Sequence, residues 1–328
     1  MFDLVKKLTG IFGVSGNEEE IREVIKSEIT GYVDDIYVDP IGNLIAVKKG
    51  TGKKIMLAAH MDEIGIMATF IDDDGFIRFS NVGWVSQYYA LGQRVKFKNG
   101  AVGAVFYEEK LDEMKNLKLS KMYIDIGAKN REDAEKKVRI GDTACFVGDT
   151  VQEGDMIISK ALDDRSGCAV LIKVLKEMPE TENELYFVFT VQEELGLRGA
   201  KTSAYRIMPD MAIAVDVTDT GDTPECELME VKCGGGPAIK IKDRSIMAHP
   251  DVKRLLEESA RELGIPYQYE VLEKGGSDPG AIHLTGGGVP SGAISIPCRY
   301  IHSPVETVNI NDLENAAKLL KKCIAAKM

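Results

Sequence analysis

The chain has 328 residues, which exceeds the roughly 250–300 residues at which a single hydrophobic core stops growing, so we expect two domains. Lys and Arg number 41 against 52 Asp and Glu, and the net charge of -11 argues against a nucleic-acid partner. The N-terminal segment is too polar for a secretory signal, and no apolar run approaches the roughly 20 residues that span a bilayer. We therefore expect a cytoplasmic protein with no membrane partner.

The first part of the chain is predicted to form one helix followed by strands. Residues 17–30 carry apolar side chains at helical spacing, which predicts an amphipathic helix with Asn17 as its N-cap. Two short apolar runs follow, and the second ends at His60. From about residue 68 to 159 the runs are short, alternating and separated by Gly, Asp and Asn, which is typical of a small β-barrel or sandwich.

After residue 160 the pattern alternates between helices and continuous apolar strands, which predicts a sheet covered on both faces. We therefore expect a three-layer α/β domain, made of residues 1–67 and 160–328, with the β-rich segment 68–159 inserted as a small barrel. The predicted helices are 163–178, 250–263 and 311–326, and the predicted strands are 184–190, 211–217 and 292–300.

The six cysteines are scattered, mostly within apolar segments, and none forms a CxxC pair. This pattern favours buried free thiols over disulfides or a thiolate metal site. They are Cys145, Cys168, Cys226, Cys233, Cys298 and Cys323.

Polar residues that could bind a metal follow the predicted strands. The carboxyl ends of parallel strands meet at one edge of an open α/β sheet, so residues far apart in sequence are expected to come together there. Two acids that open the helix after residue 160 would lie at the same edge. The strand-end residues are His60, Asp62, Glu193, Glu194, Asp216 and His302, and the helix acids are Asp163 and Asp164.

This set of imidazoles and carboxylates without thiolates suits zinc, cobalt or manganese. Two histidines and three carboxylates exceed what one tetrahedral zinc needs but match a pair of divalent ions with one bridging carboxylate, leaving a further carboxylate as general base. Each residue alone also has an ordinary role: adjacent acids at a helix start are N-caps, and Asp216 could belong to a turn.

The other two histidines look structural. His249 precedes Pro250 at the start of a helix and is interpreted as its cap. His283 lies in a glycine-rich stretch that could approach substrate through its backbone. A phosphate-binding role for that stretch is weakly supported, because neither a P-loop nor a dinucleotide fingerprint is present.

Five motifs in order, HMD, LDDRSG, VQEELG, AVDV and RYIHSPVE, resemble those of cytosolic dinuclear-metal aminopeptidases of the glutamyl aminopeptidase and tetrahedral (TET) type, part of which is labelled endoglucanase M. The resemblance covers nearly the whole chain. It implies that one metal is held by His60, Asp163 and Asp216, and the other by Asp163, Glu194 and His302, with Asp163 as the bridge.

The resemblance also implies the activity. It predicts an aminopeptidase that removes N-terminal residues from short peptides with a free N-terminus, by a bridging hydroxide with Glu193 as general base, while Asp62 orients His60. The cofactors would be two divalent ions per subunit, and the inserted segment would form the contact of dimers that build a tetrahedral dodecamer.

Three alternatives stay open at this point. A carboxypeptidase or deacylase on the same scaffold would place Arg165, Arg198 or Arg299 against a substrate carboxylate. A glycosidase, as the endoglucanase label suggests, needs two carboxyl groups but not His60 and His302. A non-catalytic shell would have no use for Glu193. The preferred N-terminal residue and the native metal are not indicated by any motif.

Overall fold

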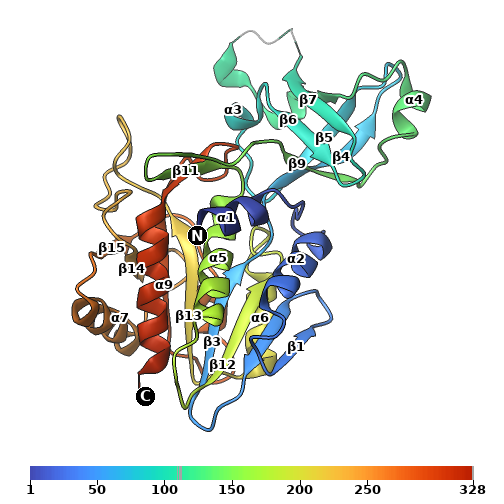
Figure 1. Cartoon of the computed structure of the whole chain (residues 1–328). Coiled ribbons are helices and arrows are strands. Elements are labelled where there is room, and N and C mark those ends of the chain that lie inside the picture. The colour runs from blue at the N-terminus through green and yellow to red at the C-terminus, as the bar shows by residue number, and fades with distance from the viewer. Residues whose placement is uncertain (109, 111–112, 327–328) are drawn as a thin grey trace.

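The computed structural model, which describes residues 1–108, 110 and 113–326, consists of a large mixed sheet flanked by helices and a separate closed barrel (Figure 1). Strands β12, β3, β13 and β16 are mutually parallel, so their carboxyl ends share one edge of the sheet. β14 (Ala238–Lys242) pairs with β16 and with β15 (Gln268–Val271). The order along the main path is β1 (Asp35–Val38), β2 (Leu44–Lys48), β12 (Glu184–Thr190), β3 (Lys54–His60), β13 (Met211–Thr218), β16 (Ser291–Arg299), β17 (Glu306–Asn309), β11 (Met156–Ser159) and β10 (Val151–Glu153).

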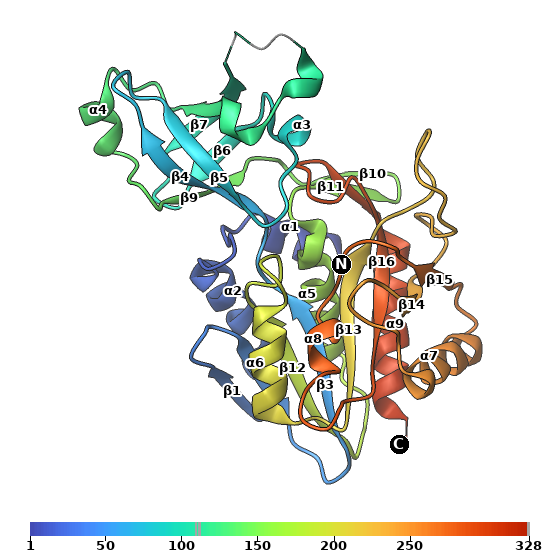
Figure 2. The same cartoon turned by 180° about the vertical axis from the view of Figure 1, so that it is seen from behind.

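Helices cover both faces of this sheet, so the predicted three-layer α/β domain is confirmed. Alternate side chains of a strand point to opposite faces: in β3, Leu57 belongs to one apolar core and Met56 to the other. The first core packs under α1 (Phe2–Thr9), α2 (Glu19–Ile29), α5 (Leu162–Lys176), α7 (Pro250–Leu263) and α9 (Ile310–Ala325). The second packs under α6 (Arg198–Ile207) and α8 (Pro279–Ile282), which lie in front of the sheet in Figure 2, the view from the opposite side.

The inserted barrel closes on itself and has its own apolar core. The sequence predicts its limits as 68 and 159, but the barrel begins with Gly65 and ends with Phe146. β10 and β11 extend the large sheet, because β11 pairs with β17. The barrel order is β4 (Gly65–Ile71), β5 (Ile77–Val82), β8 (Met122–Asp125), β7 (Val102–Tyr107), β6 (Arg94–Phe97) and β9 (Thr143–Phe146), with α3 (Gln87–Ala90), α4 (Arg131–Glu135) and 3₁₀ turns at Met114–Asn116 and Leu119–Lys121.

One local prediction is wrong, and one helix was not predicted. Glu18, rather than Asn17, is the N-cap of α2. Helix α6 has no counterpart among the predicted helices, because its buried side chains, such as Ala200 and Ala204, are small and give a weak apolar pattern. The predicted cap of α7 is confirmed, since Nδ1 of His249 accepts the backbone amide of Asp251 at 3.2 Å.

All six cysteines are free thiols, and four of them are buried. Within the described ranges, no helix combines the length and the hydropathy needed to cross a membrane.

Candidate active site

The carboxyl ends of the parallel strands bring together the candidate metal ligands. His60 is the last residue of β3 and lies in register with Thr190, the last residue of β12. Glu193 and Glu194 follow β12 by three and four residues, so they lie at the same edge of the sheet as His60. Asp216 lies near the end of β13. This is the edge at which ligands bind in open α/β sheets.

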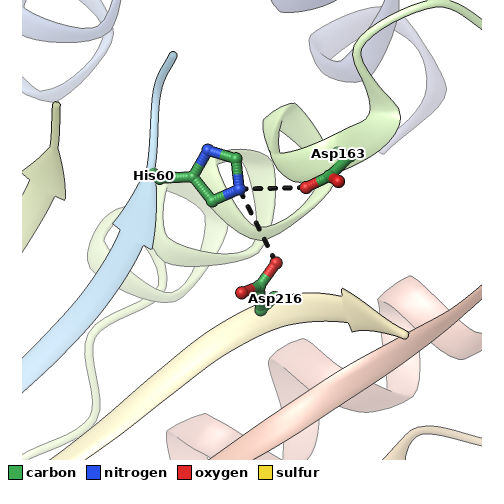
Figure 3. A group of neighbouring side chains, drawn as sticks. All are labelled: His60, Asp163 and Asp216. Atoms are coloured by element: carbon green, nitrogen blue, oxygen red, sulfur yellow. Dashed lines mark hydrogen bonds and ion pairs between the residues drawn. The ribbon is translucent and has the colours of Figure 1, made fainter. Parts of the chain in front are cut away.

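His60, Asp163 and Asp216 form the first group, and all three side chains are buried. Nε2 of His60 lies 2.9 Å from Oδ1 of Asp163 and 3.7 Å from Oδ1 of Asp216. Figure 3 shows one imidazole nitrogen facing both carboxylates, which come from β13 and from the start of α5. The three polar atoms lie within 4.8 Å of one another and could hold one metal ion.

Asp163, Glu194 and His302 form the second group. Nε2 of His302 lies 3.2 Å from Oδ2 of Asp163 and 3.1 Å from Oε2 of Glu194. Asp163 thus belongs to both groups and turns a different oxygen toward each histidine. This is the arrangement that a carboxylate bridging two ions requires.

Asp164 belongs to neither group and is hydrogen-bonded to the backbone. Its two oxygens accept the backbone amides of Gly167 at 2.9 Å and His60 at 3.3 Å. Burial raises the pKa of its carboxyl well above the ordinary value, and the charges of Asp216 and Asp163 raise it further. Asp164 therefore supports the backbone of the site, whereas Asp163 reaches both histidines.

The electrostatics of the cluster favour bound cations. Burial lowers the pKa of His302, but Glu194 and Asp163 outweigh burial and raise it to about 12. Burial raises the pKa of Glu193 well above its ordinary value, although His60 acts in the opposite direction. Oε1 of Glu194 is buried and has no hydrogen-bond partner within the described part of the chain. Divalent ions would neutralise these crowded carboxylates and engage the open oxygen, so the residues fit such ions.

Asp62 anchors the two glutamates. Its carboxylate accepts the amide of Glu193 at 3.0 Å, the amide of Glu194 at 3.3 Å and the hydroxyl of Ser15 at 2.5 Å. Nδ1 of His60 lies closer to the backbone oxygen of Asp62, at 3.1 Å, than to its carboxylate, at 3.5 Å. The peptide carbonyl is therefore the nearer partner of the imidazole, and the carboxylate chiefly holds the glutamates.

Glu306 is a supporting residue that the sequence pattern did not indicate. One oxygen accepts the amide of Asp163 at 3.1 Å, and the other accepts the amide of His302 at 2.8 Å. A single buried carboxylate thus fixes the backbone of two candidate ligands. The available signal was its place at the end of the RYIHSPVE motif, four residues after His302.

Asp278 is a second buried acid that the sequence pattern did not indicate. It lies at the start of α8, and its Oδ2 accepts the hydroxyl of Thr190 at 2.6 Å. Burial raises its pKa to about 6. No strand-end pattern points to it, since it precedes a short helix within the glycine-rich stretch. His283 lies in the same stretch, and its Nδ1 contacts the Pro279 carbonyl at 3.0 Å.

Both groups border a cavity of about 1690 Å³. Its lining includes Glu193 and, from the inserted barrel, Trp84 and Tyr89. This volume exceeds the roughly 300–1,000 Å³ of pockets for small molecules, so the cavity has room for a peptide.

Comparison with known protein families identifies the family of this chain. The M42 glutamyl aminopeptidase family matches residues 42–319, which is most of the chain. The chain belongs to the M42 glutamyl aminopeptidase family. Because M42 proteins are metallopeptidases, this M42 protein is a hydrolase, and the predicted family resemblance is confirmed.

Two M42 relatives match over nearly their whole length. A relative from Acetivibrio thermocellus is 72% identical over 324 residues, which cover 99% of this chain and 98% of the relative. The lysyl aminopeptidase of Pyrococcus furiosus is 32% identical over 98% of this chain and 95% of its own.

Solved structures confirm the fold of this M42 chain. An aminopeptidase from Desulfurococcus kamchatkensis matches with a TM-score of 0.95 and 41% identity, over 99% of this chain and 94% of that one. The TET1 peptidase of Pyrococcus horikoshii, which can assemble into a tetrahedron or a large octahedral shell, matches with a TM-score of 0.90 and 36% identity over 99% of both chains. A Thermotoga maritima protein called endoglucanase matches with a TM-score of 0.83 and 36% identity, over 98% of this chain and 96% of its own.

Proposed function

We propose that this M42 protein is a cytoplasmic, metal-dependent aminopeptidase that removes N-terminal residues from short peptides. The observation that carries the proposal is the shared carboxylate of Asp163, which faces His60 at 2.9 Å with one oxygen and His302 at 3.2 Å with the other. The six free thiols support a reducing compartment, because oxidising compartments favour disulfides.

Two divalent ions would be held by the two groups that share Asp163: His60 and Asp216 complete one, and Glu194 and His302 complete the other. When bound, they supply Lewis acidity to the scissile carbonyl and lower the pKa of the attacking water. The ligand set suits zinc, cobalt or manganese.

Glu193 is the proposed general base. Its buried carboxyl borders the cavity together with the residues of both groups, which is where a general base is needed. Glu193 takes a proton from the attacking water and delivers it to the nitrogen of the leaving amine. Asp62 positions this step by holding the amides of Glu193 and Glu194.

The arginines favour an aminopeptidase over a carboxypeptidase, which needs a free cation for the substrate carboxylate. Arg165 is fully buried and donates to the carbonyls of Leu8 and Ile11, at 2.6 and 3.1 Å. Arg299 borders the cavity, but Asp222 binds its guanidinium at 3.0 and 2.6 Å.

Arg198 donates to the side chain of Gln192 at 3.2 Å. Lys274 also borders the cavity and lies 2.6 Å from Glu227. Each of these basic groups therefore has a partner. A glycosidase is disfavoured because two histidines lie among the carboxylates, where that reaction has no role for them.

We also propose that the subunits associate through the inserted barrel into dimers and then into a tetrahedral dodecamer. Support comes from the match to the TET1 peptidase of Pyrococcus horikoshii over 99% of both chains. The exposed apolar side chains of Val102 and Phe106, on the outer face of β7, suit a protein contact. Analytical ultracentrifugation of wild type and a Phe106→Lys variant tests it: unchanged association would place the contact elsewhere.

The activity is tested with metal-stripped protein to which zinc or cobalt is restored. A panel of aminoacyl p-nitroanilides, an N-acetylated control and a Glu193→Gln variant are compared. We expect cleavage of free-amine substrates only, and a loss of at least ~10²-fold in the variant with metal content unchanged. Equal cleavage of blocked substrates, or cleavage without metal, contradicts the proposal.

A further inference from the structure

The inserted barrel places an aromatic residue directly against a candidate metal ligand. Trp84, in the segment between β5 and α3, lies with its ring centroid 5.7 Å from that of His302, and the ring planes are inclined by 41°. It is the single tryptophan of the chain. Its side chain is 61% exposed, and it borders the cavity that contains the catalytic groups.

The backbone around Trp84 is held in place on both sides. Gly83 has a φ of +76°, and a Cβ at this position would lie 2.9 Å from Ile64 and 3.2 Å from the Cβ of Glu194. Only glycine allows both this conformation and this approach. On the other side, Val85 is buried in the barrel core. Trp84 is therefore exposed although the backbone on both sides of it is held in place.

An exposed indole beside the reaction centre gives the fold little burial energy, but it offers a flat apolar face to a ligand. Tyr89, on α3, borders the same cavity, and Leu197 and Ile301 contribute apolar side chains from the catalytic domain. Aromatic rings of this kind bind apolar and aromatic side chains at little cost in conformational entropy.

We propose that Trp84, together with Tyr89, forms a specificity-determining wall that binds an apolar or aromatic side chain of the peptide substrate. This inference rests on the proposed peptidase function of the same site. The bound side chain belongs either to the N-terminal residue or to the second residue, and both sources present the same chemistry to the indole.

The first test uses fluorescence, which does not depend on turnover. In zinc-loaded Glu193→Gln protein the single tryptophan reports on its own surroundings. We expect titration with Phe-Gly or Gly-Phe to shift the emission to shorter wavelength as the indole is covered, whereas Gly-Gly leaves it unchanged. The dipeptide that causes the larger shift identifies which residue of the peptide contacts Trp84: Phe-Gly indicates the N-terminal residue and Gly-Phe the second. An emission that no dipeptide shifts overturns the proposal.

The second test compares Trp84→Ala and Trp84→Phe with the wild type on two substrate series, in which either the N-terminal or the second residue varies among Gly, Leu and Phe. In the series that varies the residue bound by Trp84, Trp84→Ala is expected to raise KM about tenfold for the Leu and Phe substrates, equivalent to ~1.4 kcal/mol. KM for Gly and kcat should stay within about threefold of wild type, and Trp84→Phe should recover most of the affinity.

Tyr88→Ala is the matched control, because Tyr88 is an exposed aromatic residue of α3, next to Tyr89, and is not among the residues that border the cavity. A loss of kcat for all substrates, Gly included, would show that Trp84 only supports His302 and would overturn the proposal. Failure of the wild type to cleave any free-amine substrate would instead contradict the peptidase function, and the fluorescence titration would still decide whether Trp84 binds peptide side chains.

Discussion

The carboxylate of Asp62, two residues after β3, accepts the backbone amide of Glu193 at 3.0 Å. Asp62 therefore holds the backbone of the residue that would act as base after β12. Its second oxygen accepts the amide of Glu194 at 3.3 Å. Two neighbouring carboxylates would repel each other on a free chain, and this hydrogen bonding holds their backbone where one faces His302. A buried carboxylate that accepts several hydrogen bonds is a firm anchor.

Asp62→Asn should reduce kcat while leaving the fold intact. The amide group can accept only through one oxygen, so at least one glutamate loses its backbone partner, and we expect a loss of about 10–100-fold in activity. Ser15→Ala removes a single hydrogen bond to the same carboxylate and should cost much less. Steady-state kinetics measures both. A similar loss in the two variants would show that the whole hydrogen-bond network, rather than the glutamate anchor, is limiting.

Glu306→Gln should weaken metal binding. The substituted amide would turn an N–H group toward the amide of either Asp163 or His302, both of which now donate to the carboxylate. Loss of such a partner of a metal ligand costs about 10–100-fold in metal affinity. Zinc titration with a competing chelator measures it.

Asp312→Asn is a matched control for Glu306→Gln. Asp312 is also buried and accepts two backbone amides, from Gly234 at 2.7 Å and Gly236 at 2.8 Å, but it lies outside the two candidate metal groups. We expect lower stability with unchanged zinc affinity. Equal losses of zinc affinity in the two variants would assign the effect to general destabilisation.

Variants of the adjacent residues Asp163 and Asp164 should differ in the number of metal ions that they bind. Asp163→Ala removes a ligand shared by both groups, so we expect neither ion to be retained. Asp164→Asn keeps an acceptor oxygen for Gly167 or His60, so we expect two ions to remain and the free energy of unfolding to fall by about 1–3 kcal/mol. Elemental analysis and denaturant unfolding test this. Retention of one ion by Asp163→Ala would contradict the bridge.

Lys240 should be important for stability. It is 2% exposed, forms a close ion pair with Glu270 and lies 3.2 Å from Asp243. Lys240→Met leaves two buried carboxylates without their cation and should cost about 3–5 kcal/mol in urea unfolding. Lys322→Met, which breaks an exposed pair with Glu262, should change stability little. Equal effects would show that burial does not govern these pairs.

The pH dependence follows from the same contacts. Burial lowers the pKa of Lys240, but Glu270 and Asp243 outweigh burial and raise it above the ordinary 10.5. The charged lysine therefore stabilises the fold fully below about pH 10.5, and this contribution is lost as the pH rises through the folded-state pKa. The stability difference between wild type and Lys240→Met should be constant from neutral pH to about pH 10 and shrink at higher pH. A difference that grows at alkaline pH would contradict this sign.

Much of the fold was predictable because its signals are local. The apolar runs that form β3, β12, β13 and β16 are continuous, and the long helices carry apolar side chains at helical spacing. Helix α6 was not predictable by this route, because small side chains such as Ala200 bury a helix without marking its face. Strands β10 and β11 resemble the barrel strands in composition. Only the pairing of β11 with β17, and of β10 with β11, places them in the large sheet.

By itself, the sequence determined which chemical groups stand at the strand ends, because residue type and strand period are local properties. The candidate ligands from His60 to His302 follow from that pattern, and the motif order identifies the family. Three contacts depend on the folded chain: Glu306 anchors Asp163, Asp62 holds Glu193, and Trp84 reaches His302 from the inserted barrel. These contacts join residues more than a hundred positions apart, and their geometry depends on the packing of the whole sheet rather than on any short stretch of chain.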